Sequence, residues 1–174
     1  MPDMIAAIWD GTLALVREHI AYAGPIVFLL GMGESIAVLS LLIPSTFLFL
    51  AIGGLHSAAG GEYWPMALAG AAGAFLGDLL SYLLGRYFRA DIGGVWPFRT
   101  RPEWYMLSRG FCSKWGGLAV IVSKFTAGLR PFVPVVAGAM ETPLWRFLPA
   151  SAVSCLLWAG IFLAPGYGVK LLWQ

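Results

Sequence analysis

Charged side chains are scarce in this sequence. Only 11% of the 174 residues are Asp, Glu, Lys or Arg, and 59% are hydrophobic, whereas a soluble domain carries about 25% charged residues. The mean hydropathy is +0.79. This composition excludes an ordinary soluble domain and predicts a membrane protein. The net charge of +2 is too small to indicate a nucleic-acid partner, and none is expected.

The residue clusters that build common active sites are also missing. The two cysteines, Cys112 and Cys155, lack the spacing of metal ligands and are expected to be packing residues. The two histidines, His19 and His56, lie far apart without metal-ligand neighbours, so both are expected at the membrane interface. No serine has the setting of a nucleophile. We therefore expect no metal, no cofactor and no enzymatic activity.

Residues 24–55 form an apolar segment that two residues interrupt. From Ile20 to Gly61 the only Asp, Glu, Lys or Arg is Glu34. The segment is longer than the roughly 20 residues of a membrane span, and Pro44 breaks helices. One interpretation is a single tilted span, and the other is a re-entrant hairpin that turns at Pro44. The length and the central proline favour the hairpin.

The remaining segments repeat the same order. A surface segment, a broken apolar segment and a span follow one another twice, with six of the eleven Lys and Arg in the second surface segment. By the positive-inside rule this basic segment is a cytoplasmic loop that lies partly on the membrane. The expected elements are an amphipathic interfacial helix over 3–22, a span over 64–88, the basic loop over 86–114, a broken segment over 115–140 and a span over 144–172 that Pro165 kinks or ends.

We therefore predict an all-α membrane protein with one domain over residues 1–174. Its halves, 1–89 and 90–174, each contain an interfacial helix, a re-entrant hairpin and a spanning helix. Because one span separates the two hairpins, the second half is inverted relative to the first. Inverted repeats whose broken helices meet at mid-membrane are a transporter architecture.

Four charged residues fall within the apolar segments: Glu34, Asp78, Lys124 and Arg130. A charge inside a membrane costs about 2.5–3.5 kcal/mol on insertion scales, so each needs a partner, water or a function. Two anions and two cations predict mutual pairing across the halves. A purely structural cluster is one interpretation. A binding site is favoured, because a purely structural buried pair can often be replaced by hydrophobic residues.

The chemistry of these groups suits an anionic ligand and a proton. Arg130 offers a planar fork for phosphate, and Lys124 adds a point charge. An apolar setting favours the neutral form of a carboxylate, so Glu34 is expected to exchange protons. Helix ends beside Pro44 and Pro131 would present backbone N–H groups to an anion.

Two stretches carry a family resemblance. GDLLSYLLGRYF contains Asp78, Tyr82 and Arg86 at the positions of a G-D-x-x-x-Y-x-x-G-R motif. SKFTAGLRPFVPVVAGAM has two basic residues six apart, followed by Pro134 and an Ala-Gly pair. With FLPASAVSCLLWAG and PGYGVKLL, these stretches resemble the DedA family of bacterial VTT-domain membrane proteins, from Gly24 to Gly168.

The resemblance implies a multi-pass protein of the bacterial inner membrane with two re-entrant hairpins. Members of the family are linked to membrane-potential maintenance and to lipid translocation, including return of the carrier lipid undecaprenyl phosphate. Their important residues are two acids in the first hairpin and two arginines in the second. Glu34 matches the first acid and Arg130 the second arginine, whereas Thr46 replaces the second acid and Lys124 the first arginine.

The predicted function is movement of an anionic lipid, such as a polyprenyl phosphate, between leaflets with proton coupling. Arg130 and Lys124 would hold the phosphate, Glu34 would change its protonation, and Asp78 would position a cation or a helix. Two alternatives remain open, a proton-coupled carrier of a small solute or ion and a structural scaffold. A homo-oligomer is compatible with either. The residues expected to support the site are Pro44, Thr46, Tyr82, Arg86 and Pro134.

Overall fold

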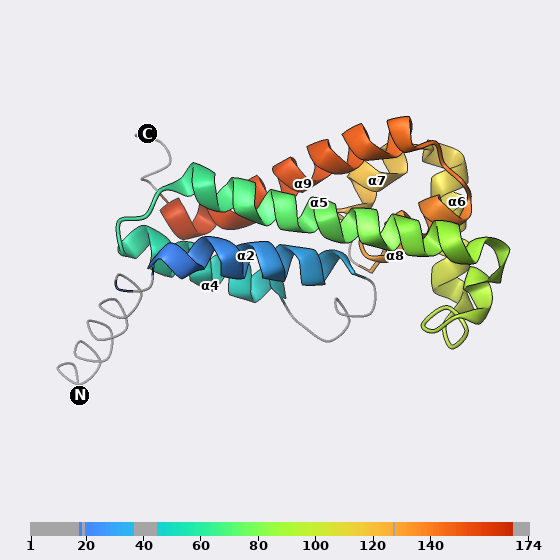
Figure 1. The fold of residues 1–174 in the computed structure, drawn as a ribbon, viewed down its shortest axis with the longest axis horizontal. Helices are drawn as coiled ribbons and strands as arrows, with labels where there is room; N and C mark the ends of the chain where they lie inside the picture. The colour runs from blue at the N-terminus through green and yellow to red at the C-terminus, as the bar shows by residue number, and fades with distance from the viewer. Residues whose placement is uncertain (1–17, 19, 37–44, 127, 169–174) are drawn as a thin grey trace.

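The computed structural model describes residues 18, 20–36, 45–126 and 128–168 (Figure 1). These residues form seven α-helices and one 3-10 helix, and no strand occurs among them. The all-α prediction is therefore confirmed for this part of the chain. The interfacial helix expected over 3–22 falls almost wholly outside it. In chain order the elements are α2 (Ile20–Ser35), α4 (Ser45–Ala58), α5 (Tyr63–Phe88), η1 (Arg89–Gly94), α6 (Pro102–Trp115), α7 (Leu118–Ser123), α8 (Phe132–Ala139) and α9 (Leu144–Tyr167).

Two helices of the described chain, α5 and α9, are long and apolar enough to cross a membrane. They confirm the spans predicted over 64–88 and 144–172, and they lie side by side along the molecule (Figure 1). Pro165 does not end α9, which continues to Tyr167. The helix stops where Gly168 has a φ of 51°, a positive value that glycine adopts without the steric cost that other residues meet.

Both broken segments contain pairs of short helices. α2 has 16 residues and α4 has 14, each fewer than the roughly 20 of a span. α2 packs mainly on α5 and α4 mainly on α9 (Figure 1). The turn predicted at Pro44 lies outside the described residues, so the re-entrant hairpin and the inverted repeat stay predictions. The break in the second segment is confirmed, since α7 and α8 have six and eight residues.

The basic segment 86–114 is largely helical, so the prediction of a loop is wrong for its secondary structure, whereas the helix predicted in the surface segment of the second half is present as α6. Pro102 begins α6 and Gly116, with a φ of 54°, follows its last residue, which is the usual placing of these residues at helix ends. One face of α6 is buried through Ser108 and Cys112. Met106, Leu107 and Trp115 of this helix are exposed. A loop was predicted because the many charged and polar residues of this segment obscure the helical spacing of the apolar residues in α6.

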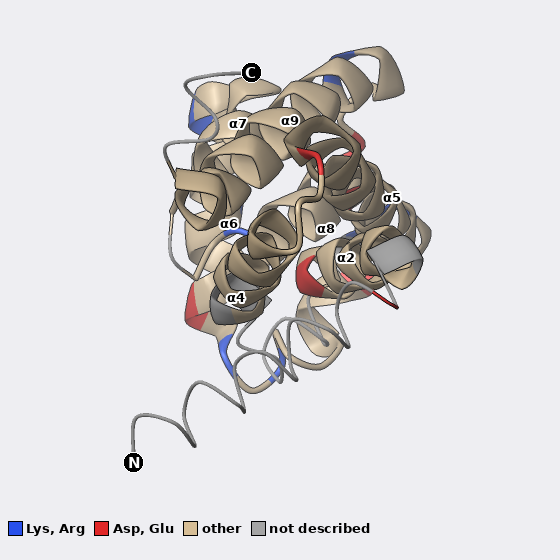
Figure 2. Cartoon of the chain, turned by 90° about the vertical axis from the view of Figure 1, so that its left-hand side faces the viewer, with Lys and Arg blue, Asp and Glu red and all other residues tan. Residues whose placement is uncertain are grey.

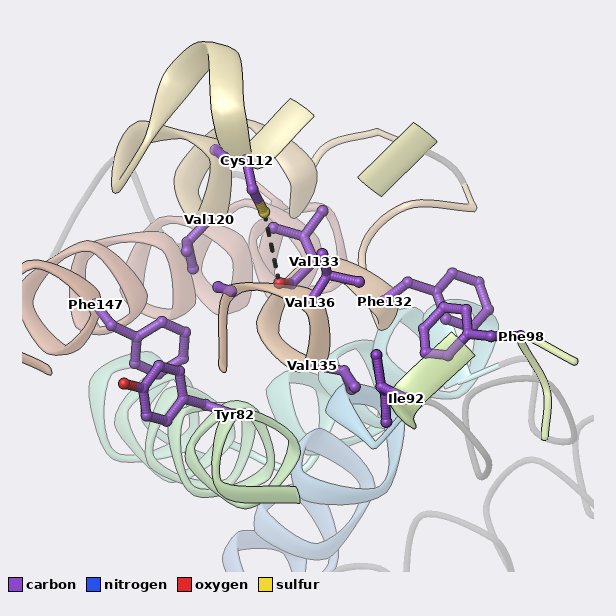
Figure 3. Packing of buried hydrophobic residues seen from close by; sticks show 12 residues of the cluster. Tyr82, Ile92, Phe98, Cys112, Val120, Phe132, Val133, Val135, Val136 and Phe147 are labelled. Atoms are coloured by element: carbon purple, nitrogen blue, oxygen red, sulfur yellow. Dashed lines mark hydrogen bonds between the residues drawn. The ribbon is translucent and has the colours of Figure 1, made fainter. Parts of the chain in front are cut away.

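Two apolar cores are arranged along the molecule. The first joins α2 and α4 to the beginning of α5 and the end of α9, around Phe49 and Trp158. The second joins the end of α5 to η1, α6, α7, α8 and the beginning of α9 (Figure 3). In the second core the Cys112 Sγ lies 3.9 Å from the Val133 carbonyl oxygen, and burial raises the pKa of this thiol to about 11. Cys112 is thus an inert packing residue, as predicted.

Helices α5 and α8 touch through backbone at two glycines. A Cβ on Gly85 would overlap the Val135 carbonyl, and a Cβ on Gly138 would overlap the Tyr82 carbonyl. Gly85→Ala is therefore expected to lower the free energy of unfolding by about 1–3 kcal/mol through overpacking. Thermal unfolding in detergent measures this change.

The matched control for this prediction is Gly110→Ala. Gly110 also lies inside a helix, but a Cβ there would meet nothing within 4 Å. Because alanine favours helix over glycine by about 1 kcal/mol, this variant should unfold at the wild-type temperature or above it. Equal unfolding temperatures for the two variants would contradict the close contact between α5 and α8.

Candidate functional site

The four buried charges form two ion pairs. The Lys124 Nζ lies 2.7 Å from each carboxylate oxygen of Asp78, and the Arg130 Nη1 pairs with the Glu34 Oε1. Each anion belongs to the predicted first half and each cation to the second, so the predicted pairing across the halves is confirmed. Figure 2 looks along the helices, and most of the residues in them are neither acidic nor basic.

Helix ends position three of the four charges. Glu34 is in the last turn of α2, Lys124 directly follows α7, and Arg130 lies two residues before α8 begins. A carboxylate at the C-terminal end of a helix opposes the helix dipole. The α2 helix therefore does not stabilise the charge of Glu34, and the guanidinium of Arg130 supplies that stabilisation.

The pair of Asp78 and Lys124 is sealed from solvent, with side chains 0% and 2% exposed. Lys124 also donates to the Ser35 Oγ at 3.1 Å. Its three oxygen partners match the three N–H donors of an ammonium group. The Asp78 Oδ2 further accepts from the Ser151 hydroxyl at 2.9 Å and contacts the Cys155 Sγ at 3.3 Å. This pair therefore ties α2, α5, α7 and α9 together.

The pair of Glu34 and Arg130 differs in one respect that matters for ligand binding. The Glu34 side chain is 1% exposed, but that of Arg130 is 20% exposed. The guanidinium carbon lies 5.7 Å from the centre of the Trp158 ring, within cation–π range. Of the four charges, Arg130 is thus the one that both reaches the surface and has the planar fork that phosphate favours.

The end of α2 links the two ion pairs. Glu34 pairs with Arg130, while its neighbour Ser35 accepts from Lys124 through its hydroxyl. The Ser35 carbonyl also accepts from the Ser81 hydroxyl at 3.0 Å. Any displacement of this helix end therefore changes the surroundings of both cations together.

The site lies between the two apolar cores. Along α5, Asp78 is one turn from Ala74 of the first core and one turn from Tyr82 of the second. Such a junction gives the charges a low-dielectric surrounding on both sides, which strengthens each ion pair.

The predicted supporting residues brace the second core. The Tyr82 hydroxyl donates to the Thr142 carbonyl at 2.6 Å and accepts from the Arg86 Nη1 at 2.9 Å. Pro134 is buried within α8, which packs against α5. These residues fix the end of α5 beyond Asp78. Pro44 lies outside the described residues, and so does the side chain of Thr46, whose backbone belongs to the first turn of α4.

One expectation about helix ends is wrong. The backbone N–H groups of Phe132 and Val133, at the start of α8, both donate to the Leu129 carbonyl at 3.1 Å. The helix end beside Pro131 therefore does not offer these groups to an anion. The carbonyl of Leu129, in the turn just before α8, accepts both hydrogen bonds instead. The corresponding helix end beside Pro44 falls outside the described residues.

The structure also identifies residues that the sequence analysis did not select. Ser151, Cys155 and Trp158 are four and three residues apart on α9, a spacing that places them on one helical face. They line the site, and this period in an apolar helix was the available signal. His56, which was expected at the membrane interface, is buried within the protein, and its Nδ1 lies 2.5 Å from the Tyr167 hydroxyl. Its burial and partner depend on how α4 meets α9.

Within the described ranges, no group of three or more His, Cys, Asp or Glu residues could hold a metal ion.

Comparison with known proteins assigns the chain to a family. The VTT domain family matches residues 43–168, which include Asp78 and the segment from α7 to α8. The chain belongs to the VTT domain family. The motif of this VTT-domain protein has a structural meaning, since Gly77 and Gly85 allow close backbone contacts, Asp78 binds Lys124, and Arg86 donates to Tyr82.

Similar proteins are named as membrane proteins. Inner membrane protein YabI of Escherichia coli is 28% identical over 87% of this chain and 59% of its own length. Uncharacterized membrane protein BU139 of Buchnera aphidicola is 26% identical over 88% of this chain and 60% of its own. Inner membrane protein YghB of Escherichia coli is 26% identical over 98% and 79%.

These matches and the two apolar spans identify the chain as a DedA/VTT-family protein of the bacterial inner membrane. The chain spans about three fifths of the length of the first relatives it matches. No solved structure matches it significantly.

Proposed function

We propose that this VTT-domain protein moves a lipid with an anionic phosphate headgroup, such as a polyprenyl phosphate, between the leaflets of the inner membrane. The observation that supports the proposal is the ion pair of Glu34 and Arg130, in which only the cation is partly exposed. A guanidinium that pairs with a carboxylate can also pair with a phosphate, because both anions accept N–H bonds from its planar fork.

In the proposed cycle, Glu34 and the headgroup compete for Arg130. When Glu34 takes up a proton, its attraction to the guanidinium falls, and a phosphate replaces it. When Glu34 loses the proton, it recovers Arg130 and displaces the headgroup. One proton is thereby exchanged for each headgroup bound, which couples lipid movement to protons.

The two cations have different roles in this proposal. Lys124 has its donors directed at Asp78 and Ser35, so it holds the helices together and does not bind phosphate directly. The short helices α2, α4, α7 and α8 would act as re-entrant hairpins of an inverted repeat and present Glu34 and Arg130 from opposite halves. The proposed activity is reversible ion pairing and transport, without a catalytic step.

Reconstituted vesicles test the proposed function. A fluorescent polyprenyl phosphate is placed in both leaflets, and its exposure to an added quencher is followed over time with and without an inward-acid pH gradient. The wild-type protein should speed exchange of the phosphate lipid but not of the matching neutral polyprenol. Equal exchange in vesicles without protein would contradict the proposal. Proton-driven currents without lipid movement would favour a carrier of a small solute or ion instead.

A further inference from the structure

Trp158 carries a buried hydrogen-bond donor that has no acceptor. The residue is 1% exposed, and its indole Nε1 has no hydrogen-bond partner. The ring packs edge-on against Phe49, with centroids 4.8 Å apart. Buried indole N–H groups usually find a partner, and an unsatisfied buried donor in a native structure calls for an explanation.

The position of this indole suggests an explanation for its unpaired N–H group. The Arg130 guanidinium carbon lies 5.7 Å from the centre of the Trp158 ring. On α9, Trp158 follows Ser151 and Cys155, which contact Asp78, on the same helical face. The indole ring therefore lies beside Arg130, the one partly exposed cation of the two ion pairs. A phenylalanine would supply the same packing and a weaker cation–π contact, but only tryptophan adds the N–H group.

We propose that the indole N–H of Trp158 donates to an oxygen of the phosphate that binds Arg130. This inference rests on the proposed function and adds a second contact to it. The guanidinium carbon lies 5.7 Å from the centre of the ring, a separation that one phosphate can bridge with hydrogen bonds of about 2.9 Å to each group. The donor selects ligands that present an acceptor oxygen beside Arg130, and it remains unpaired while Glu34 occupies the fork.

Binding measurements on Trp158→Phe test the contact, because this change keeps a ring beside Arg130 and removes the N–H. The probe is geranylgeranyl phosphate added to the full-length protein in detergent, with geranylgeraniol as the neutral counterpart. Trp158→Phe should weaken binding of the phosphate about tenfold, the usual effect of a lost hydrogen bond to a charged group. Binding of the alcohol should be unchanged. Trp64→Phe, at a residue 67% exposed, should bind both probes as the wild type does.

Nuclear magnetic resonance of the ¹⁵N-labelled indole groups gives a readout that a merely structural role would not change. The Trp158 signal is assigned by its loss in Trp158→Phe. It should move downfield when geranylgeranyl phosphate is added and stay in place with geranylgeraniol. Inorganic phosphate forms a second arm, and a shift with it but not with the lipid would overturn the lipid headgroup as the source of the phosphate.

The remaining outcomes separate this inference from the proposed function. If both proteins bind geranylgeranyl phosphate equally and the Trp158 signal does not move, the contact is refuted while the lipid site at Arg130 stands. If the wild type fails to bind the phosphate lipid at all, both the proposed function and the Trp158 contact are refuted.

Discussion

Lys124→Met is expected to prevent the protein from accumulating in the membrane in folded form. The change leaves the Asp78 carboxylate at 0% exposure without its cation. Breaking a buried ion pair by removing one partner destabilises by about 3–5 kcal/mol, a large part of the roughly 5–15 kcal/mol that holds a domain together. The amount of protein in isolated membranes and its thermal unfolding in detergent measure the effect.

A double variant separates charge balance from packing. Asp78→Asn with Lys124→Met removes both charges and keeps similar volumes, so it should accumulate far better than Lys124→Met alone. Lys124→Arg keeps the cation and should be closer to the wild type. If Lys124→Met alone accumulates normally and unfolds at the wild-type temperature, the sealed pair does not have the stabilising role described above.

Arg130→Gln is expected to abolish lipid exchange while the protein remains folded. Arg130 is 20% exposed, and the amide of a glutamine at this position can still donate a hydrogen bond to the Glu34 carboxylate, so the loss of stability should be smaller than for Lys124→Met. Loss of the charge-assisted contacts to phosphate should weaken lipid binding roughly 10- to 100-fold. The vesicle exchange assay and the thermal unfolding temperature measure the two effects separately.

Two further substitutions at this pair sharpen the prediction. Arg130→Lys keeps the charge but loses the planar fork, so exchange should fall between the wild type and Arg130→Gln. Exchanging the charges, with Glu34→Lys and Arg130→Glu together, keeps an ion pair but moves the cation to α2. This protein should fold and fail to transport. Wild-type exchange by the swapped protein would show that the pair is purely structural.

Apolar length and charge scarcity were enough to predict α5, α9 and the four residues of the ion pairs. The sequence also predicted that the anions would meet the cations. It did not predict which anion meets which cation, because that depends on the rotation of α2 and α5 about their axes. The different roles of Lys124 and Arg130 could not be predicted either, because burial of a side chain follows from packing of distant helices.

Other features were predicted wrongly or missed, also because they depend on how distant parts of the chain pack. The basic segment was interpreted as a loop because the charges that indicate its side of the membrane also conceal the amphipathic period of α6. The partner of His56 could not be predicted, because Tyr167 is 111 residues away in the sequence. Trp158 was passed over because a tryptophan in an apolar helix is ordinarily a packing residue, and only its unpaired N–H distinguishes it.

The affinity of Glu34→Gln for geranylgeranyl phosphate tests most directly whether Glu34 and the lipid phosphate compete for Arg130. A glutamine cannot hold the guanidinium with a charge, so the phosphate no longer has to displace a carboxylate. Competition predicts that Glu34→Gln binds the phosphate lipid about tenfold more tightly than the wild type at neutral pH, which corresponds to about 1.4 kcal/mol. Weaker or unchanged binding by a folded Glu34→Gln protein would contradict it.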